Sequence, residues 1–274
     1  MMTRKFDITY SIEKIWNKDL FIYVNHKVAT LCWAVLKQKT ELCDVITFDS
    51  HRDYRDGVIL QKKTTTESLT LPIEKRCFSS KYYQEVDFPH FTTSKEFMHW
   101  NPLDEKQNER IALEQKYFAP NNDNFIDVAF MKGLVSNVYC YFIQTRNETH
   151  SGKCDDVFGK THFFEMMHIE NFRKPKPNRK FVLDIDQDFF TKSDYESGDP
   201  ESVVIPEPDL KKYISLMKSL GQQENCVGIT LALEPDCCGS EENCLTICSY
   251  FSEVFDKDIT SVSKYRIAAN YQIH

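Results

Sequence analysis

The chain has 274 residues, a net charge of −7 and 41% apolar residues, with 20 Phe and 13 Tyr available for a core. This length predicts one large α/β domain or two small ones. The negative charge gives no reason to expect nucleic-acid binding. The apolar run Val28–Leu36 is far shorter than the roughly 20 residues that cross a bilayer, so no membrane segment is expected.

The ten cysteines form no CxxC pair, and we expect no secretory signal peptide. Both points favour reduced thiols in a cytoplasmic protein. A group of four near the C-terminus raises the alternative of a zinc site: Cys237, Cys238, Cys244 and Cys248. Its spacing fits no structural zinc pattern, so ordinary core or surface thiols are the favoured interpretation.

Short runs rich in β-forming residues predict strands, and each run ends in polar residues. These strands are expected at 21–24, 45–48, 138–143, 181–183 and 226–233. Their nearly continuous apolar character is typical of a buried, mostly parallel sheet. Helices expected at 27–39 and 209–220 fit βαβ crossovers. In such a sheet ligands bind outside the carboxyl ends of the strands, where these polar residues stand.

Three segments lack this pattern and are expected to be loop-like: 55–122, 145–180 and 191–208. The first is polar and long, with 108–117 as a candidate helix. Long excursions of this kind serve as lids or recognition surfaces, or are tolerated insertions. We therefore expect a single domain over 1–274 with a loop-rich insertion at about 55–122.

The sequence FDSHRDY, at 48–54, places Asp49, His51 and Asp53 at every second position after a predicted strand. Alternate residues of an extended segment share one face. Acidic groups gathered beside an apolar strand are costly unless they are solvated, protonated or bound to a cation. The motif therefore predicts a binding site for a cation.

The sequence LDIDQDFF, at 183–190, repeats the pattern with Asp184, Asp186 and Asp188. The apolar residues on both sides make full solvation of three carboxylates unfavourable, so a divalent metal is the natural neutraliser. Carboxylate oxygens with one or two imidazoles suit Mn²⁺. One such motif also occurs as a turn cap, but two of them, with His26 after a third strand, favour a metal site.

These motifs together resemble the ureohydrolase (arginase-like) superfamily, and more specifically its branch that includes peptide arginases. The matching segments run from about residue 20 to residue 240: NHKVATLCW, FDSHRD, NFIDVA, LDIDQDFF and LALEP. The resemblance implies a three-layer arginase-like α/β fold, with a mostly parallel central sheet and helices on both faces. Arginases usually carry Gly-Gly-Asp before the first His, whereas Val24 and Asn25 stand here, which fits the peptide-arginase branch better.

The resemblance also implies six ligands for two Mn²⁺ ions: His26, Asp49, His51, Asp53, Asp184 and Asp186. Asp49 and Asp184 would bridge the ions. His26 and Asp53 would complete one site, and His51 and Asp186 the other.

Glu234 would accept the substrate guanidinium, because a carboxylate after a buried strand needs a cationic partner. Its alternative is a turn cap before Pro235. Asp188 would contact substrate or support the ligands, since arginases place an Asp-Pro three residues after the second Asp. Asn124 would contact substrate or cap the segment that follows it. No proton shuttle can be assigned among the candidates, which are His90, His99, His150 and His162.

The expected reaction is the hydrolysis of the guanidinium of an arginine residue in a peptide or protein, a modification that gives ornithine and urea. Two metal ions would generate the hydroxide nucleophile at neutral pH. One alternative is another C–N hydrolase of the same fold, acting on agmatine, another guanidino compound or an acylated polyamine. The other is a metal-binding module without turnover. The sequence does not predict the oligomeric state.

Overall fold

The computed structural model describes residues 10–51, 53, 125–131, 133–144, 149–155, 160–176, 178–193 and 202–271. The predicted insertion at 55–122 and its candidate helix at 108–117 lie outside the described residues. Within the described ranges, no helix combines the length and apolar character needed to cross a membrane.

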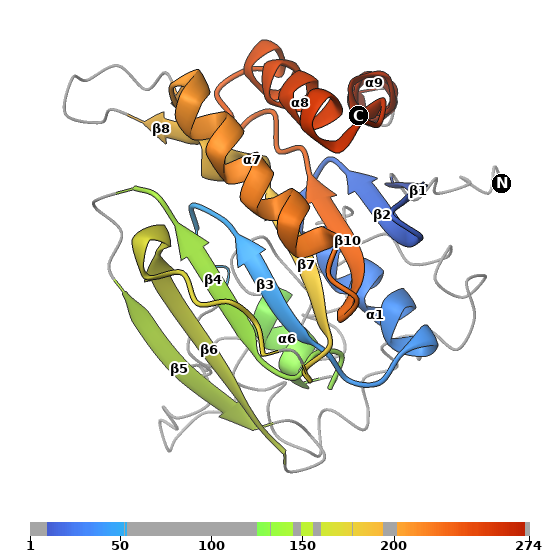
Figure 1. Cartoon of the computed structure of the whole chain (residues 1–274), viewed down its shortest axis with the longest axis vertical. Helices are drawn as coiled ribbons and strands as arrows, with labels where there is room; N and C mark the ends of the chain where they lie inside the picture. The colour runs from blue at the N-terminus through green and yellow to red at the C-terminus, as the bar shows by residue number, and fades with distance from the viewer. Residues whose placement is uncertain are drawn as a thin grey trace, which may run out of the picture.

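A single eight-stranded sheet organises the described chain (Figure 1). Its spatial order is β1 (Tyr10–Ile15), β2 (Lys18–Tyr23), β10 (Cys226–Ala232), β7 (Phe181–Asp186), β3 (Asp44–Phe48), β4 (Val138–Phe142), β6 (Thr161–His168) and β5 (His150–Asp155). The strands from β2 to β6 in this order pair in parallel, and only β1 and β5 at the two edges pair antiparallel. The prediction of a mostly parallel sheet is confirmed.

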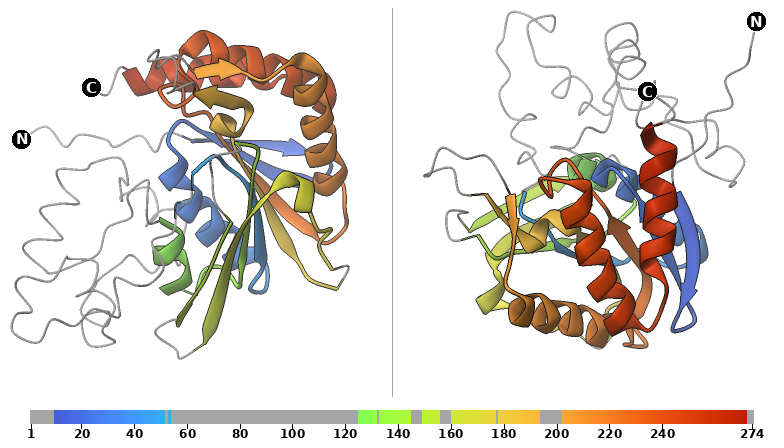
Figure 2. Two further views of the ribbon diagram at one scale, coloured as in Figure 1. Left: turned by 90° about the vertical axis from the view of Figure 1, so that its left-hand side faces the viewer. Right: turned by 90° about the horizontal axis from the view of Figure 1, so that it is seen from above.

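Helices cover the sheet on both faces (Figure 2). On one face lie α1 (Ala29–Lys39), which follows the short 3₁₀ turn His26–Val28, and α6 (Phe125–Met131). On the other, α7 (Glu207–Gly221) packs against β7 and β10, and α8 (Glu241–Phe255) and α9 (Ile259–Tyr271) continue this layer beside β2.

Successive strand residues alternate between two cores, because neighbouring side chains of a strand point to opposite faces. In β2, Phe21 and Tyr23 join the core under α1, whereas Ile22 joins the core under α7 and α8. In β7, Val182 and Leu183 divide in the same way. Both faces are therefore buried, which explains why these strands have nearly continuous apolar sequences.

The helix expected at 209–220 is present as α7, one or two residues longer at each end. Its buried residues Leu210, Ile214, Met217 and Leu220 recur at helical spacing and face the sheet. The helix expected at 27–39 is present as the 3₁₀ turn and α1. The fold is therefore predicted well where apolar periodicity is strong.

The expectation that 145–180 is a loop is wrong, because this range contains β5 and β6. β5 is an edge strand with the polar sequence HSGKCD, and β6 alternates between exposed and buried residues, leaving Phe163 54% exposed. The predicted loop 191–208 likewise contains a small antiparallel pair, β8 (Thr191–Ser193) and β9 (Ser202–Val204). Polar edge strands lack the apolar run that marks a central strand.

The close approach of α1 to β10 gives a stability prediction. A Cβ atom added at Gly228 would lie 2.6 Å from the Leu36 side chain, so Gly228→Val should lower the free energy of unfolding by about 1–3 kcal/mol through overpacking. Urea denaturation measures this change. The control Val203→Ala, at a side chain 62% exposed on β9, should stay within about 0.5 kcal/mol. Equal effects of the two substitutions would contradict this packing.

Candidate metal centre

Four neighbouring parallel strands bring distant parts of the sequence to one edge of the sheet. β2, β10, β7 and β3 are adjacent and parallel, so their carboxyl ends lie side by side. His26 follows β2, Glu234 follows β10, Asp186 ends β7 and Asp49 follows β3. The topology therefore assembles these side chains.

The imidazole of His26 stands at the middle of this group and is only 2% exposed. Its Nδ1 lies 3.3 Å from Asp49 Oδ2, 3.0 Å from Asp53 Oδ2 and 2.9 Å from Asp186 Oδ2. Its Nε2 lies 2.8 Å from Asp184 Oδ2, on the other side of the ring. The two ring nitrogens therefore face different carboxylates.

Asp184 is engaged almost entirely by donors from its own sheet. Thr230 of β10 donates to Oδ1 at 2.5 Å and Tyr23 of β2 donates to the same oxygen at 3.3 Å. Thr47 of β3 donates to Oδ2 at 2.8 Å, beside the Nε2 of His26. The carboxylate lies fully buried. Its two oxygens therefore contact three hydroxyl groups of the sheet and the ring of His26.

A second group forms around His51, whose Nδ1 lies 2.6 Å from Asp188 Oδ2. The backbone N–H of His51 donates to Asp49 Oδ1 at 2.6 Å. Among the described residues, the ligand atoms of Asp49, His51 and Asp188 lie within 4.8 Å of one another, as do those of His26, Asp49 and Asp53. The two groups could each hold a metal ion, and they share Asp49.

The electrostatics of the cluster favour the binding of a cation. Burial raises the pKa of Asp49 well above its ordinary value, and the carboxylates of Asp53 and Asp188 raise it further. Burial by itself lowers the pKa of His26, but Asp184 and Asp186 raise it well above its usual value. These protein groups alone therefore hold protons that a divalent cation would displace.

Two buried polar atoms mark the position that such a cation would occupy. His26 Nδ1 and Asp49 Oδ2 have no hydrogen-bond partner, although they lie 3.3 Å apart. Unpartnered buried polar atoms are rare in folded proteins. A cation between them would satisfy both, so the residues present fit a divalent metal.

The backbone is strained at two residues of the site. Asp53 has φ 42° and Glu234 has φ 40°, a left-handed conformation that non-glycine residues adopt infrequently. Glu234 Oε1 accepts the backbone N–H of His26 at 2.5 Å, and Oε2 accepts from Cys237 Sγ at 3.1 Å. The strained turn thus holds the Glu234 carboxylate beside the His26 segment.

The contact between Cys237 and Glu234 was not predicted from the sequence. Burial and the neighbouring Glu234 carboxylate raise the pKa of its thiol above the ordinary range, which keeps it a neutral donor. Its position three residues after Glu234 was the available signal. Among the described residues no metal-binding group includes a cysteine, and the described cysteines are free thiols.

The remaining candidate residues divide into two groups. Asn124, His90 and His99 lie outside the described residues. His162 is fully buried against Phe130, where its ring also lies 2.6 Å from the Ser136 carbonyl oxygen. His150 lies on edge strand β5. Neither of these two described histidines belongs to a metal-binding group.

A comparison of the chain with protein-family models and with curated proteins finds no match. Membership of the ureohydrolase superfamily therefore stays a prediction. The structure itself shows an α/β fold whose parallel sheet carries buried His and Asp groups that could bind metal.

If Asp49 binds both metal ions, the stabilisation of the folded protein by metal should depend on its carboxylate. Because metal binds the folded state, saturating MnCl₂ should raise the unfolding temperature of the wild-type protein, through a gain of about 2.7 kcal/mol in unfolding free energy per ion at 100 times the dissociation constant. Asp49→Asn should lose this gain. Without added metal it should be at least as stable as wild type, because an amide cannot acquire the charge that burial and the neighbouring carboxylates disfavour at this position.

Differential scanning calorimetry with and without MnCl₂ measures both effects. Asp209→Asn, at an exposed acid in the first turn of α7, is the matched control and should retain the full metal-dependent shift. A wild-type shift in Asp49→Asn would contradict the shared position.

Proposed function

We propose that the protein is a binuclear manganese hydrolase of the arginase-like class that acts on the guanidinium of an arginine residue in a peptide or protein. The products would be ornithine and urea. The observation that carries this proposal is the pair of His/Asp groups joined through Asp49, with the Glu234 carboxylate beside them. The preference for a peptide rests on the resemblance of the motifs.

The distances favour a division of ligands that differs from the sequence expectation. One ion would be held at His26 Nδ1 by Asp49, Asp53 and Asp186, and the other by Asp49, His51 and Asp188. Asp184 would orient His26 through Nε2, as carboxylates commonly do for metal-binding histidines. The LDIDQDFF motif would thus supply Asp186 and Asp188 as ligands, in place of Asp184 and Asp186.

The donor set suits manganese, since carboxylate oxygens and imidazole nitrogens together bind this ion well. When bound, two divalent ions would lower the pKa of water and supply hydroxide at neutral pH. The residues of the chain would position the groups that bind the metal. Asp184 would fix the tautomer of the metal-bound His26 by accepting from Nε2, which would leave Nδ1 for the metal.

Glu234 would bind the substrate. Its carboxylate is held by the His26 N–H and the Cys237 thiol and is 8% exposed, so a guanidinium would pair with it in a site that contains little water. This contact would orient the guanidinium carbon toward the metal-binding side chains. Hydrolysis would then break the bond between that carbon and the arginine Nε, with water supplying the oxygen of urea and both of its protons going to the amine, which leaves as an ammonium.

The metal content of two variants tests the assignment of ligands. Asp188→Asn should lose one of two manganese ions. Asp184→Asn should retain both at saturating metal, with about 10–100-fold weaker affinity because the support of His26 is disturbed. Elemental analysis after equilibrium dialysis measures both values. Loss of an ion in Asp184→Asn together with full content in Asp188→Asn would support the sequence-based assignment instead.

Mass spectrometry of arginyl peptides tests the reaction. The manganese-loaded protein should remove CH₂N₂ from arginine residues, and Glu234→Gln should keep its metal but lose at least about 2 kcal/mol of transition-state binding, roughly 30-fold in rate. Glu241→Gln, at an exposed residue of α8, is the matched control and should react like wild type.

Several outcomes would contradict the proposal. Turnover of agmatine or free arginine without turnover of peptides would exclude the peptide substrate. Turnover of acetylated polyamines that does not depend on Glu234 would indicate a deacylase. Full metal content without turnover of any of these compounds would indicate a binding module.

A further inference from the structure

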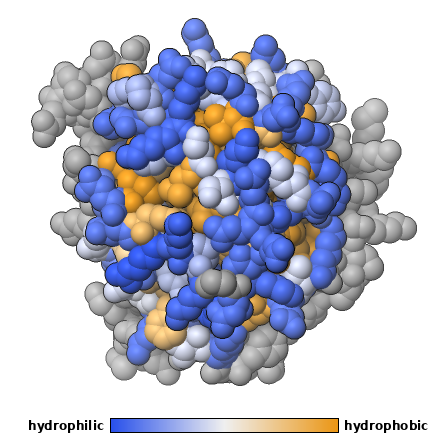
Figure 3. All heavy atoms as spheres, in the orientation of Figure 1, coloured by the Kyte–Doolittle hydropathy of each residue, from blue (hydrophilic) through white to orange (hydrophobic). Residues whose placement is uncertain are grey.

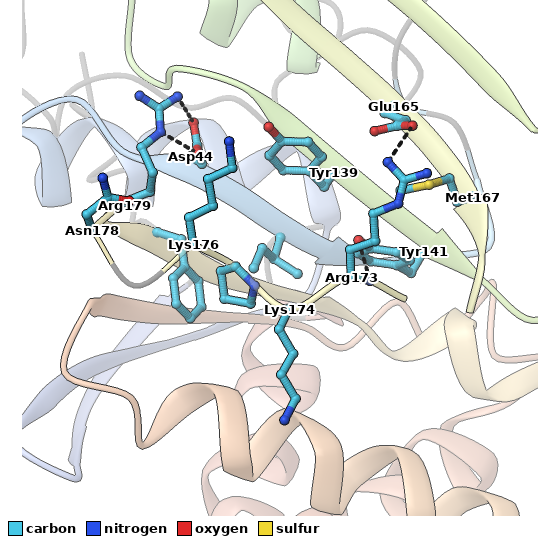
Figure 4. A pocket seen from close by; sticks show the side chains of 13 residues that line it. Asp44, Tyr139, Tyr141, Glu165, Met167, Arg173, Lys174, Lys176, Asn178 and Arg179 are labelled. Atoms are coloured by element: carbon cyan, nitrogen blue, oxygen red, sulfur yellow. Dashed lines mark hydrogen bonds and ion pairs between the residues drawn. The ribbon is translucent and has the colours of Figure 1, made fainter. Parts of the chain in front are cut away.

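A cavity of about 480 Å³ lies against the sheet, apart from the acidic cluster (Figure 4). Its apolar floor consists of side chains from four neighbouring strands: Ile46, Tyr139, Tyr141, Met167 and Phe181. Phe181 begins β7, whereas Asp186 ends it, a separation of roughly 15 Å along an extended strand. The cavity is therefore distinct from the proposed metal centre.

The connection from β6 to β7 explains why a cavity exists here. Parallel strands are usually joined through a helix, which would cover the sheet with a cylinder about 10–12 Å wide. Here the described part of the connection, after the short 3₁₀ turn Ile169–Asn171, contains no helix and crosses the face as a thin segment (Figure 1). Figure 3 shows hydrophobic residues at the surface between hydrophilic ones on this face.

The two ends of the cavity are closed by ion pairs. Arg179 Nε and Nη2 donate to Asp44 at 3.2 and 3.3 Å, and Arg173 lies 3.7 Å from Glu165. Figure 4 shows these pairs on opposite sides of the apolar floor. Both arginines are thus matched by carboxylates of this chain, and neither needs a ligand for neutralisation.

Between these ends stand Lys176 and Tyr139, whose polar groups have no hydrogen-bond or ion-pair partner among the described residues. Lys176 lines the cavity and extends toward the side of Tyr139 in Figure 4. No ion pair or hydrogen bond engages its ammonium or the Tyr139 hydroxyl. Lys174, two residues earlier, points away from the other labelled side chains. The Lys176 ammonium and the Tyr139 hydroxyl therefore stand over the apolar floor.

We propose that this cavity binds a small molecule that carries one anionic group on a flat, apolar body. Lys176 and Tyr139 would bind the carboxylate or phosphate, and the floor would contact the ring. The volume is within the range of about 300–1,000 Å³ typical of small-molecule sites, which combine an apolar lining with few polar groups. The site is independent of the proposed hydrolase activity.

Paired ligands with the same ring test this assignment. Isothermal titration calorimetry of the full chain should detect indole-3-propionate or 3-indoxyl phosphate and should detect no binding of tryptamine, whose charge is reversed. The stronger of the two anions identifies the preferred head group. Lys176→Glu should weaken the binding of that anion by about tenfold or more, which is the effect of one lost charged hydrogen bond.

Lys180→Glu is the matched control, because it makes the same change of charge on the same segment at an exposed lysine that does not line the cavity. Its affinity should stay within about twofold of wild type, well below the effect of a lost charged contact. Tyr139→Phe, which keeps the ring, should weaken binding less than Lys176→Glu does. Absence of binding by both anions, equal binding of tryptamine, or equal losses in the two lysine variants would overturn the proposal.

Discussion

The contact between His26 Nε2 and the Asp184 carboxylate is the interaction on which the site depends. Asp184 is itself held by Tyr23, Thr47 and Thr230 from the three neighbouring parts of the sheet. The position of the imidazole is therefore set by the packing of β2, β3, β7 and β10, and its Nδ1 is directed at the other carboxylates. Rigid support of this kind is what a metal or catalytic site requires.

By itself, this cluster of buried carboxylates lowers the stability of the folded protein. Carboxylates buried close together raise one another's pKa, as they do for Asp49 and Asp186, and the left-handed residues Asp53 and Glu234 add backbone strain. The extensive apolar cores on both faces of the sheet offset these costs. Strain and buried charge that are concentrated at one edge of a well-packed sheet are typical of a functional site.

The sequence predicts the central strands and the grouping of the acidic residues, but it does not predict how deeply each carboxylate is buried or which groups contact it. Alternation puts Asp184, Asp186 and Asp188 on one face, yet only the register of β7 against β3 and β10 places Thr47 and Thr230 beside Asp184. Strand β5 was missed because its polar edge sequence resembles a loop, and β6 was missed because exposed and buried residues alternate in it in place of a continuous apolar run. The cavity beneath 173–179 could not be foreseen, since it arises where a crossover helix is replaced by an extended segment.

The most direct test of this account is anomalous diffraction at the manganese edge from crystals grown with MnCl₂. The account predicts two peaks on the Nδ1 side of His26, one near Asp53 and Asp186 and the other near His51 and Asp188, with Asp49 between them. It also predicts no peak between His26 Nε2 and Asp184. A peak bound to Asp184, or no peak at Nδ1, would contradict the central role given to the His26–Asp184 contact.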